Sequence, residues 1–378
     1  MTRIGIDYTP AYEQGAGIGR LVRDLVTTLA QQDKNTCYRL FVAGHQGDLA
    51  DPLAANFSWA PTRITPRWLA RIWQRARLPI PVELFIGRVD LYHATDFVLP
   101  PTLPRTKTIV TVHDLSFERV PDAASPTLRA YLRQVVPRSV WRADHVIADS
   151  QATKNDLVDL YAIPRDKVTV LLSGINPRYA PVTTRHVLLT IRSKYRLSDR
   201  PYLLAVGTVQ PRKNYSRIIQ ALARLRQAGY AIDFVIAGGK GWLEGEMYQT
   251  ITATGMKDYV HLIGYVDDED LPALYSHAAC VVYPSLYEGF GFPVLEGMAC
   301  GTPVVTSTVS SLPEVAGDAA LLVDPHDVTA ITSAIQRILD DHTLRETLIQ
   351  RGFEQVKGFT WAQSARHLRE IYQQVLDS

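Results

Sequence analysis

The stretch YLLAVGTVQPRKNYSRIIQALARLRQAG, residues 202–229, decides the fold. Its beginning, YLLAVGTV, is a short apolar run and predicts a buried strand. The residues from Asn214 to Gly229 predict a helix. A strand that leads through a short loop into a helix is the repeating unit of parallel sheets with helices on both faces.

This alternation of strand and helix occurs in two series along the chain. The first includes RIGIDY, YRLFVAG, TIVTVH and HVIADS, and the second starts at residue 202 and includes DFVIAG, VHLIGYV and CVVYPS. Two series predict an α/β protein with two doubly wound, Rossmann-like parallel-sheet domains that face a cleft. We place the N-terminal domain at 1–178, with a final crossover helix at 361–378, and the C-terminal domain at 179–360. The polar segment 176–201 is the predicted linker.

Composition excludes several classes of protein. The chain has 378 residues and a net charge of +2, which is too balanced for a protein whose main partner is nucleic acid. The three cysteines have no metal-ligand spacing and fit a reducing compartment. No signal peptide is expected, because MTRIGIDYTP enters a strand at once, and no apolar run reaches the length of a membrane span. We therefore expect a cytoplasmic protein, free or bound to the inner face of the cell membrane.

A glycine-rich loop precedes the first predicted helix. Gly15, Gly17 and Gly19 lie in QGAGIG. Small residues let backbone N–H groups approach an anion at a helix N-terminus. A plain strand-to-helix turn is the alternative, and the glycines alone leave both open.

Two cations follow the strand that opens the second series. Arg212 and Lys213 lie directly before the helix that begins near Asn214. Cations do not stabilise a helix N-terminus, which is already positive, so the pair suggests an anionic ligand such as a diphosphate. The alternative is a solvated surface pair. We expect both side chains to be exposed.

The stretch YEGFGFPVLE, residues 287–296, places two glutamates around a pliable loop. Gly289 and Gly291 weaken a helix, and Pro293 suits a first helical turn, so Glu288 is expected in the loop and Glu296 in the helix. The two carboxylates then bracket backbone N–H groups at a helix N-terminus. Carboxylates accept from hydroxyls and N–H groups face phosphate, so the arrangement can hold a polyol phosphate. In the alternative, Glu296 only complements the helix dipole and Glu288 is solvated.

Histidines end two strands of the first series. His113 follows TIVTV at the expected cleft edge and is a candidate acid, base or hydrogen-bonding group. A histidine that bonds a neighbouring loop is the alternative, and His93 is a weaker candidate. We expect no metal site, because His113 and Asp114 lack further ligands at a suitable spacing. The acidic run 267–270 is read as a helix start.

Together these motifs resemble family 4 of the retaining nucleotide-sugar glycosyltransferases, which have the GT-B fold. The match includes E-x7-E as Glu288 and Glu296, together with GTVQPRKN, the glycine loop and VHDLSF. The motifs fall in both halves in the right order, so the resemblance covers nearly the whole chain. It is closest to mannosyltransferase-like members that build bacterial surface polysaccharides.

The resemblance implies roles for these residues toward a nucleoside-diphosphate sugar. Arg212 and Lys213 would hold the diphosphate, Glu296 would bind the ribose and Glu288 the sugar hydroxyls, while His113 would touch the sugar near the reacting carbon. The N-terminal glycine loop, Gly15 to Gly19, would close over the phosphates, and the loop between the glutamates would present N–H groups to them. The remaining donor-binding positions are Gly207, Val266, Phe290, Gly291 and Phe292.

The chemistry that the resemblance implies needs no cofactor. Two cations and a helix N-terminus would stabilise the departing diphosphate without a metal. The acceptor, a glycan or lipid-linked saccharide, would attack on the face that the diphosphate leaves. GDP-mannose is the favoured donor, with UDP-glucose and UDP-N-acetylglucosamine as alternatives. A nucleotide-sugar 2-epimerase of the same fold and a non-catalytic sugar-nucleotide-binding protein are the rival readings.

An arginine- and tryptophan-rich segment raises the question of a membrane. RITPRWLARIWQRARLPIP, within 63–82, repeats arginine every four residues with Trp68 and Trp73 between. A basic stripe beside a Trp-containing stripe suits an amphipathic helix on an anionic membrane surface. In the alternative, both tryptophans pack on the N-terminal domain and the arginines are solvated.

Overall fold

The computed structural model describes residues 1–15, 17–47 and 49–378 and divides into two compact units. The N-terminal domain comprises Met1–Leu115, Thr127–Gly174 and Thr360–Ser378. The C-terminal domain comprises Ser116–Pro126 and Ile175–Phe359. Each domain is described by itself.

The N-terminal domain is built on a parallel sheet with the strand order β3-β2-β1-β4-β5-β6-β7. These strands are nearly continuous apolar runs, as expected for a sheet covered on both faces. The strands are β1 (Arg3–Asp7), β2 (Cys37–Ala43), β3 (Phe57–Thr62), β4 (Leu91–Ala94), β5 (Lys107–Val112), β6 (His145–Ala148) and β7 (Val168–Val170).

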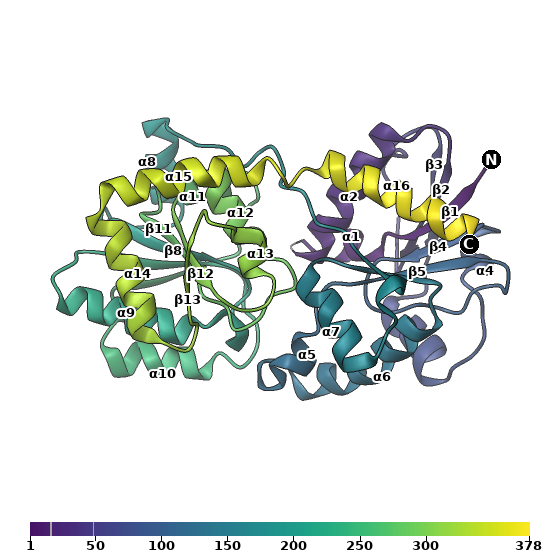
Figure 1. The fold of residues 1–378 in the computed structure, drawn as a ribbon, viewed down its shortest axis with the longest axis horizontal. Coiled ribbons are helices and arrows are strands. Elements are labelled where there is room, and N and C mark those ends of the chain that lie inside the picture. The colour runs from purple at the N-terminus through teal and green to yellow at the C-terminus, as the bar shows by residue number, and fades with distance from the viewer. Residues whose placement is uncertain (16, 48) are drawn as a thin grey trace. The chain divides into compact units, whose positions relative to one another are not determined.

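The first and last long helices of the N-terminal domain lie side by side. Figure 1 shows α16 (Trp361–Asp377) next to α2 (Ile18–Gln32), so the end of the chain packs with its beginning. Both helices are amphipathic and bury one apolar face. The other helices are α1 (Thr9–Glu13), α3 (Pro66–Ala70), α4 (Glu83–Ile86), α6 (Pro126–Arg142) and α7 (Gln151–Tyr161), with a π-helix at Arg71–Arg75.

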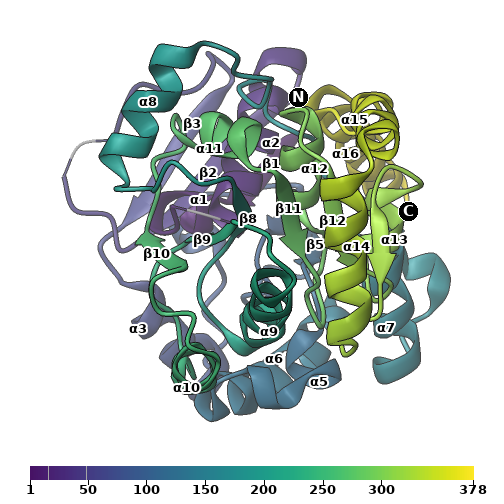
Figure 2. The same cartoon turned by 90° about the vertical axis from the view of Figure 1, so that its left-hand side faces the viewer.

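The C-terminal domain has a second parallel sheet, in the order β10-β9-β8-β11-β12-β13. Figure 2 shows α9, α10 and α14 on one face of this sheet and α11 and α12 on the other. The strands are β8 (Tyr202–Val206), β9 (Asp233–Ala237), β10 (Val260–Gly264), β11 (Cys280–Tyr283), β12 (Val304–Ser307) and β13 (Leu321–Val323). The helices are α8 (Arg185–Lys194), α9 (Tyr215–Gln227), α10 (Gly245–Thr254), α11 (Leu271–His277), α12 (Phe292–Ala299), α13 (Leu312–Ala316), α14 (Val328–Asp340) and α15 (His342–Val356).

The predicted fold class, two doubly wound parallel-sheet domains, is therefore confirmed. Two details differ from the sequence analysis. The predicted linker contains α8, which is stabilised by packing on α11 and by burial of Ile191 rather than by a long apolar pattern. Residues 116–126, with the short helix α5 (Ser116–Arg119), group with the C-terminal domain, where the indole N–H of Trp242 donates to the carbonyl of Ala123 at 2.7 Å.

Among the residues that the structure describes, no helix combines the length and apolar content needed to cross a bilayer.

Candidate active site

The C-terminal domain brings the two predicted cations onto one predicted carboxylate. The ammonium of Lys213 donates to Glu288 Oε1 at 2.8 Å, and the guanidinium of Arg212 donates to Glu288 Oε2. Arg212 also donates to the carbonyl of Tyr287 at 3.1 Å, and Lys213 donates to the hydroxyl of Tyr283. We call Arg212, Lys213 and Glu288 the donor-side triad, after the role that the resemblance implies for them.

Lys213 and Glu288 are buried and Arg212 is half-buried, which corrects the predicted exposure of the two cations. Lys213 is 6% exposed and Glu288 is 5% exposed, and the Arg212 side chain is 19% exposed. The error has a physical reason: each cation reaches a carboxylate about 75 residues away in the chain, and pairing makes burial of the charges tolerable. The alternative of a solvated surface pair is therefore wrong.

Two loops at the carboxyl ends of β8 and β11 are fastened together to form this triad. The backbone N–H of Leu286 donates to the carbonyl of Arg212 at 2.8 Å. Asn214, in the left-handed conformation with φ of 62°, uses its side-chain amide to donate to the carbonyls of Pro284 and Pro325. Gly207 packs against the Lys213 side chain, where an added Cβ would lie 3.1 Å from Cε. The cations are thus positioned by backbone contacts.

The charge state of the triad follows from its surroundings. Burial alone would raise the pKa of Glu288, but the adjacent charges of Arg212 and Lys213 outweigh it and lower the pKa to about 2. Glu288 is therefore an anion at neutral pH. Two cations and one anion leave the triad with a net positive charge.

The loop that carries Glu288 is locked by two serines. Ser311 donates to the carbonyls of Glu288 and Phe290 at 2.9 and 2.7 Å, and Ser310 accepts from the N–H of Glu288 at 3.0 Å. The loop leads into α12 through Gly291, whose φ of 118° favours glycine. An added Cβ there would lie 2.7 Å from the end of the Leu312 side chain, which would have to move, so the conformation is the main requirement for glycine.

The second predicted glutamate, Glu296, is more deeply buried than Glu288. Glu296 is in α12, is 1% exposed, and accepts a hydrogen bond from the hydroxyl of Tyr275 at 2.6 Å. It does not join the donor-side triad. The rings of Phe290 and Phe292 contact each other edge to face at 5.1 Å between centroids, and Val266 is buried directly after β10.

The acidic run after Val266 has partners within its own domain. Lys194 of α8 donates to Asp267 at 3.0 Å and to Asp270, and Tyr195 donates to Asp270 at 2.6 Å. Within residues 1–15, 17–47 and 49–378, no three His, Cys, Asp or Glu side chains are grouped so that they could hold a metal ion.

In the N-terminal domain, His113 follows β5 and is held at both ring nitrogens. Nε2 lies 2.8 Å from the carbonyl of Thr95, which can only accept, so Nε2 carries a proton. Nδ1 lies 2.8 Å from a carboxylate oxygen of Asp149. Burial on its own would lower the pKa of His113, but the Asp149 charge and hydrogen bond outweigh it and raise the pKa to about 9. His113 is therefore a cation at neutral pH, with both N–H groups used inside the domain.

A group of carboxyls that the sequence analysis missed surrounds a cavity of about 180 Å³ beside this edge of the sheet. Asp7 ends β1, Asp96 follows β4, and Glu13 ends α1. Burial raises the pKa of all three, that of Asp7 to about 6. Tyr131 also lines the cavity, which we call the carboxyl cavity.

The other predicted residues of this domain have structural partners. Gly17 caps α2 with φ of 54°, and Gly19 packs so closely that an added Cβ would lie 2.0 Å from the carbonyl of Gln14. Gly15 accepts from Arg23 at 3.2 Å, and Ala16 of the predicted glycine loop lies outside the described residues. His93 bonds Tyr372 and Thr111, each at 2.8 Å, and burial lowers its pKa to about 3. His93 therefore joins α16 to the sheet.

Comparison with known families assigns the chain. The profile described as "Glycosyltransferase Family 4" matches residues 15–179, and the profile "Glycosyl transferases group 1" matches residues 189–355. The chain is also 36% identical over 272 residues to O-antigen chain mannosyltransferase B of Escherichia coli, which covers 72% of this chain and 71% of the relative. The chain belongs to glycosyltransferase family 4.

Solved structures agree with the fold of this glycosyltransferase. Sucrose-phosphate synthase from Thermosynechococcus elongatus superposes over 100% of both chains with a TM-score of 0.75 and 21% identity. HepE of Anabaena, in complex with UDP and glucose, superposes over 99% of this chain and 100% of its own with a TM-score of 0.72 and 19% identity. At these identities the likeness shows the GT-B fold alone.

The family assignment decides between the three readings of the sequence. The chain is a glycosyltransferase, so the 2-epimerase and the non-catalytic binding protein are set aside. Residues that sequence reasoning missed include Tyr283, Ser311, Asp149 and the carboxyl cavity. The one available signal was that Asp7, Asp96 and Asp149 each end or follow a predicted strand of the first series.

Proposed function

We propose that this glycosyltransferase moves a hexose from a nucleoside-diphosphate sugar to a saccharide acceptor with retention of the anomeric configuration. Mannose is the hexose that we favour. The observation that carries the proposal is the donor-side triad, in which one buried carboxylate is shared by the buried Lys213 and the half-buried Arg212. Its net positive charge suits a diphosphate, which gains negative charge as it leaves the sugar. The loop between the two glutamates adds the positive end of the α12 dipole nearby.

In this proposal the triad has two tasks. Arg212 and Lys213 stabilise the leaving diphosphate, and Glu288, an anion held between them, accepts hydrogen bonds from hydroxyls of the transferred sugar. The leaving phosphate takes the proton of the attacking acceptor hydroxyl on the same face of the sugar. Glu296 binds the ribose after its bond to Tyr275 opens.

We favour GDP-mannose because the relative described above is named a mannosyltransferase. UDP-glucose is the main alternative, since the HepE neighbour was solved with UDP and glucose. We also propose that transfer needs no metal ion, because two cations and a helix N-terminus can supply the positive charge.

The carboxyl cavity is our proposed acceptor site. Asp7, Asp96 and Glu13 lie at the carboxyl edge of the N-terminal sheet, where ligands of doubly wound domains bind. Carboxylates accept hydrogen bonds from saccharide hydroxyls. The cationic His113 near Asp96 helps to keep that carboxyl ionised against the effect of burial.

We propose that the segment 63–82 attaches the enzyme to an anionic membrane surface. The two tryptophans differ: Trp68 is 56% exposed with Arg71 stacked on it at 4.6 Å, whereas Trp73 packs on Phe41 and Phe85. The alternative in which both tryptophans pack on the domain therefore holds for Trp73 alone. The exposed Trp68 and its arginine neighbours remain available for lipid headgroups.

One experiment tests the proposed reaction. Purified enzyme is incubated in EDTA with GDP-mannose and a mannose-terminated acceptor, and the product's anomeric configuration is determined by NMR. We expect acceptor-dependent GDP release and an α-mannoside. Transfer from UDP-glucose in preference to GDP-mannose would reject the donor, a β-mannoside would reject retention, and activity restored only by Mg²⁺ or Mn²⁺ would reject the metal-free mechanism.

A further inference from the structure

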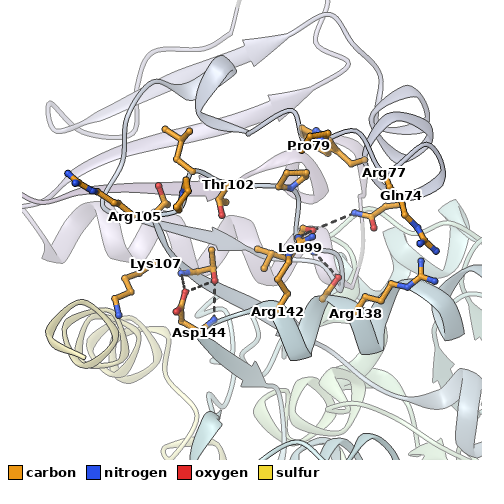
Figure 3. Close-up of a pocket in the computed structure, with 17 residues that line it drawn as sticks. Gln74, Arg77, Pro79, Leu99, Thr102, Arg105, Lys107, Arg138, Arg142 and Asp144 are labelled. Carbon is orange, nitrogen blue, oxygen red and sulfur yellow. Dashed lines mark hydrogen bonds between the residues drawn. The ribbon is translucent and has the colours of Figure 1, made fainter.

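A second, larger cavity of the N-terminal domain carries an unusual concentration of positive charge. Figure 3 shows this cavity of about 730 Å³, which we call the basic pocket. Its walls come from the end of the π-helix and the turn after it, the loop before β5, and the C-terminal part of α6. The cations that line it are Arg77, Arg105, Lys107, Arg138 and Arg142.

The basic pocket lies at the opposite end of the strands from His113. Lys107 is the first residue of β5, and His113 follows its last residue. At about 3.3 Å per residue, the two ends of this strand are roughly 20 Å apart. The pocket is therefore separate from the carboxyl edge, where the acceptor site is proposed.

The charge of the basic pocket is not balanced by carboxylates. Among the described residues that line it, Asp144 is the one carboxylate, and it accepts from the backbone N–H and the hydroxyl of Thr108, both at 2.7 Å. Arg142 donates to the carbonyls of Leu99 and Pro100 and to no carboxylate. Within the part of the chain that the structure describes, Arg77, Arg105, Lys107 and Arg138 form no ion pair or side-chain hydrogen bond. Like charges gathered around a cavity repel one another and favour a bound anion.

The walls of the basic pocket are fixed before any ligand binds. The indole N–H of Trp73 donates to the carbonyl of Ile80 at 2.8 Å, which ties the turn back to the π-helix. The N–H of Val82 donates to the carbonyl of Pro101 at 2.9 Å, and the N–H of Leu103 donates to Glu83 at 3.0 Å. These bonds join the two walls that carry Arg77 and Arg105. Because the backbone of both walls is fixed, only the side chains of the cations lose conformational entropy when they bind an anion.

The backbone at Arg77 is itself uncommon. Arg77 has φ of 53°, in the left-handed region that residues other than glycine seldom adopt, and it directly follows a rare π-helical turn. Figure 3 shows its side chain on the same side of the pocket as Arg138. Irregular backbone of this kind is frequent at binding sites.

Apolar side chains lie exposed at the edge of the same pocket. Leu103 lines it and is 38% exposed, and Leu78, between the lining residues Arg77 and Pro79, is 46% exposed. A free phosphate ion would make no favourable contact with exposed leucines next to its site. A lipid has both parts, a phosphate for the arginines and acyl chains for the leucines.

We propose that the basic pocket binds the phosphate of an anionic phospholipid headgroup. The guanidinium groups of Arg77 and Arg138 bind phosphate oxygens, Arg105 and Lys107 add positive charge, and Leu78 and Leu103 contact the acyl boundary. The choice of a lipid as the source of the phosphate rests on the proposed membrane association. The inference that the pocket binds an anion does not depend on which sugar the enzyme transfers. The basic pocket would therefore bind one headgroup specifically, whereas the segment 63–82 contributes general surface charge to membrane attachment.

The test compares two double variants that remove the same charge. Arg77→Ala/Arg138→Ala empties the pocket of two cations, and Arg39→Ala/Arg88→Ala removes two exposed arginines of the same domain that do not line it. Each protein is floated with vesicles of phosphatidylglycerol and phosphatidylcholine, with pure phosphatidylcholine vesicles and inorganic phosphate competition as further arms. Transfer to a soluble acceptor is measured in parallel.

We expect the wild type to float with anionic vesicles and the pocket variant to show about a thirty-fold lower partition coefficient, since each arginine near the surface contributes roughly 1 kcal/mol. The control variant should lose much less, and transfer to the soluble acceptor should be unchanged in both. Equal losses in the two variants would overturn the pocket in favour of general surface charge. No flotation of the wild type, or inorganic phosphate binding lost in the pocket variant without any flotation, would overturn the lipid headgroup. Loss of transfer by the pocket variant with flotation intact would also overturn the lipid site, whereas absence of transfer by the wild type would count against the proposed reaction alone.

Discussion

The two domains have the same doubly wound fold but opposite charge at the carboxyl edges of their sheets. In the C-terminal domain, Arg212 and Lys213 share Glu288, and their charges lower the pKa of that carboxyl to about 2. In the N-terminal domain, burial raises the pKa of Asp7 and Asp96, and His113 is the cation among them. One edge has an excess of cations and the other an excess of carboxyls. The comparison suggests that the fold supplies a position for a ligand and the loops supply its charge.

The largest loss of activity is expected when a cation is removed from the cationic edge of the C-terminal sheet. Lys213→Met removes a charge that we propose faces the leaving diphosphate, and kcat/KM should fall by a factor of one hundred or more, which corresponds to about 3 kcal/mol. Stability should fall as well, because Glu288 keeps its burial and loses one of two cationic partners. Steady-state kinetics and chemical unfolding measure the two effects.

Lys194→Met is the matched control for this prediction. Lys194 is a lysine of the same domain, and its partners Asp267 and Asp270 are near the surface rather than in the triad. Its loss should leave kcat/KM within a factor of about two to three, as for other exposed ion pairs. Full activity in Lys213→Met would show that the cationic edge does not bind the diphosphate.

The second prediction concerns the carboxylate within the same triad. Glu288→Gln keeps the shape of the side chain but removes its charge, so both cations stay free to bind a diphosphate. Affinity for the free nucleoside diphosphate should be retained or increased, while kcat falls through the lost sugar contact. Calorimetric titration measures the affinity for the nucleoside diphosphate, and steady-state kinetics measures kcat. A parallel loss of nucleoside-diphosphate binding would show that Glu288 does not act on the sugar end alone.

Glu288 also makes a prediction about acid stability. Its folded pKa of about 2 lies below its usual value of 4.5, so its stabilisation is present above pH 4.5 and is lost as the pH falls toward 2. The difference corresponds to roughly 3 kcal/mol of unfolding free energy. Between pH 7 and pH 3, the unfolding free energy of Glu288→Gln should therefore change less with pH than that of the wild type. Identical slopes would contradict the ionised buried state of Glu288.

Much of this contrast could be predicted from the sequence, and part of it could not. The strand and helix series predicted both domains, and the glycines and proline between Glu288 and Glu296 predicted one glutamate in the loop and the other in the helix, as found. The burial of Lys213 was missed because its partner lies 75 residues away, and periodicity within a segment carries no information about contacts between loops. The carboxyl cavity was missed for the same reason, since Asp7 and Asp96 come from different strand ends. The helix α8 was missed because one buried residue, Ile191, anchors it.

The fourth prediction sharpens the comparison at the carboxyl-rich edge. The folded pKa of His113, about 9, lies above its usual value of 6.5. Its stabilisation is therefore complete below pH 6.5 and is lost as the pH rises toward 9. The slope of unfolding free energy against pH cannot exceed about 1.4 kcal/mol per pH unit, the limit for one proton.

Unfolding free energy measured between pH 6.5 and pH 9 checks this slope, and His113→Asn, which cannot titrate, should remove it. NMR titration of the imidazole gives the pKa directly. A value at or below 6.5 would mean that Asp149 carries the shared proton, and His113 would then be neutral in the protein at pH 7.

The smallest effect is expected at the proposed acceptor site. Asp96→Asn keeps the shape of the side chain and its ability to accept one hydrogen bond, but removes the charge near His113. A hydrogen bond to a charged group typically contributes about 1.5–3 kcal/mol, and the amide retains part of it, so we expect KM for the saccharide acceptor to rise about tenfold. KM for the donor should not change, because the donor-side triad belongs to the other sheet. Asp51→Asn, at an exposed aspartate of the same domain, is the control and should leave both values unchanged. If Asp96→Asn raised KM for the donor and spared the acceptor, the carboxyl cavity would belong to donor binding, and the opposite charges of the two sheets would not divide the two substrates between them.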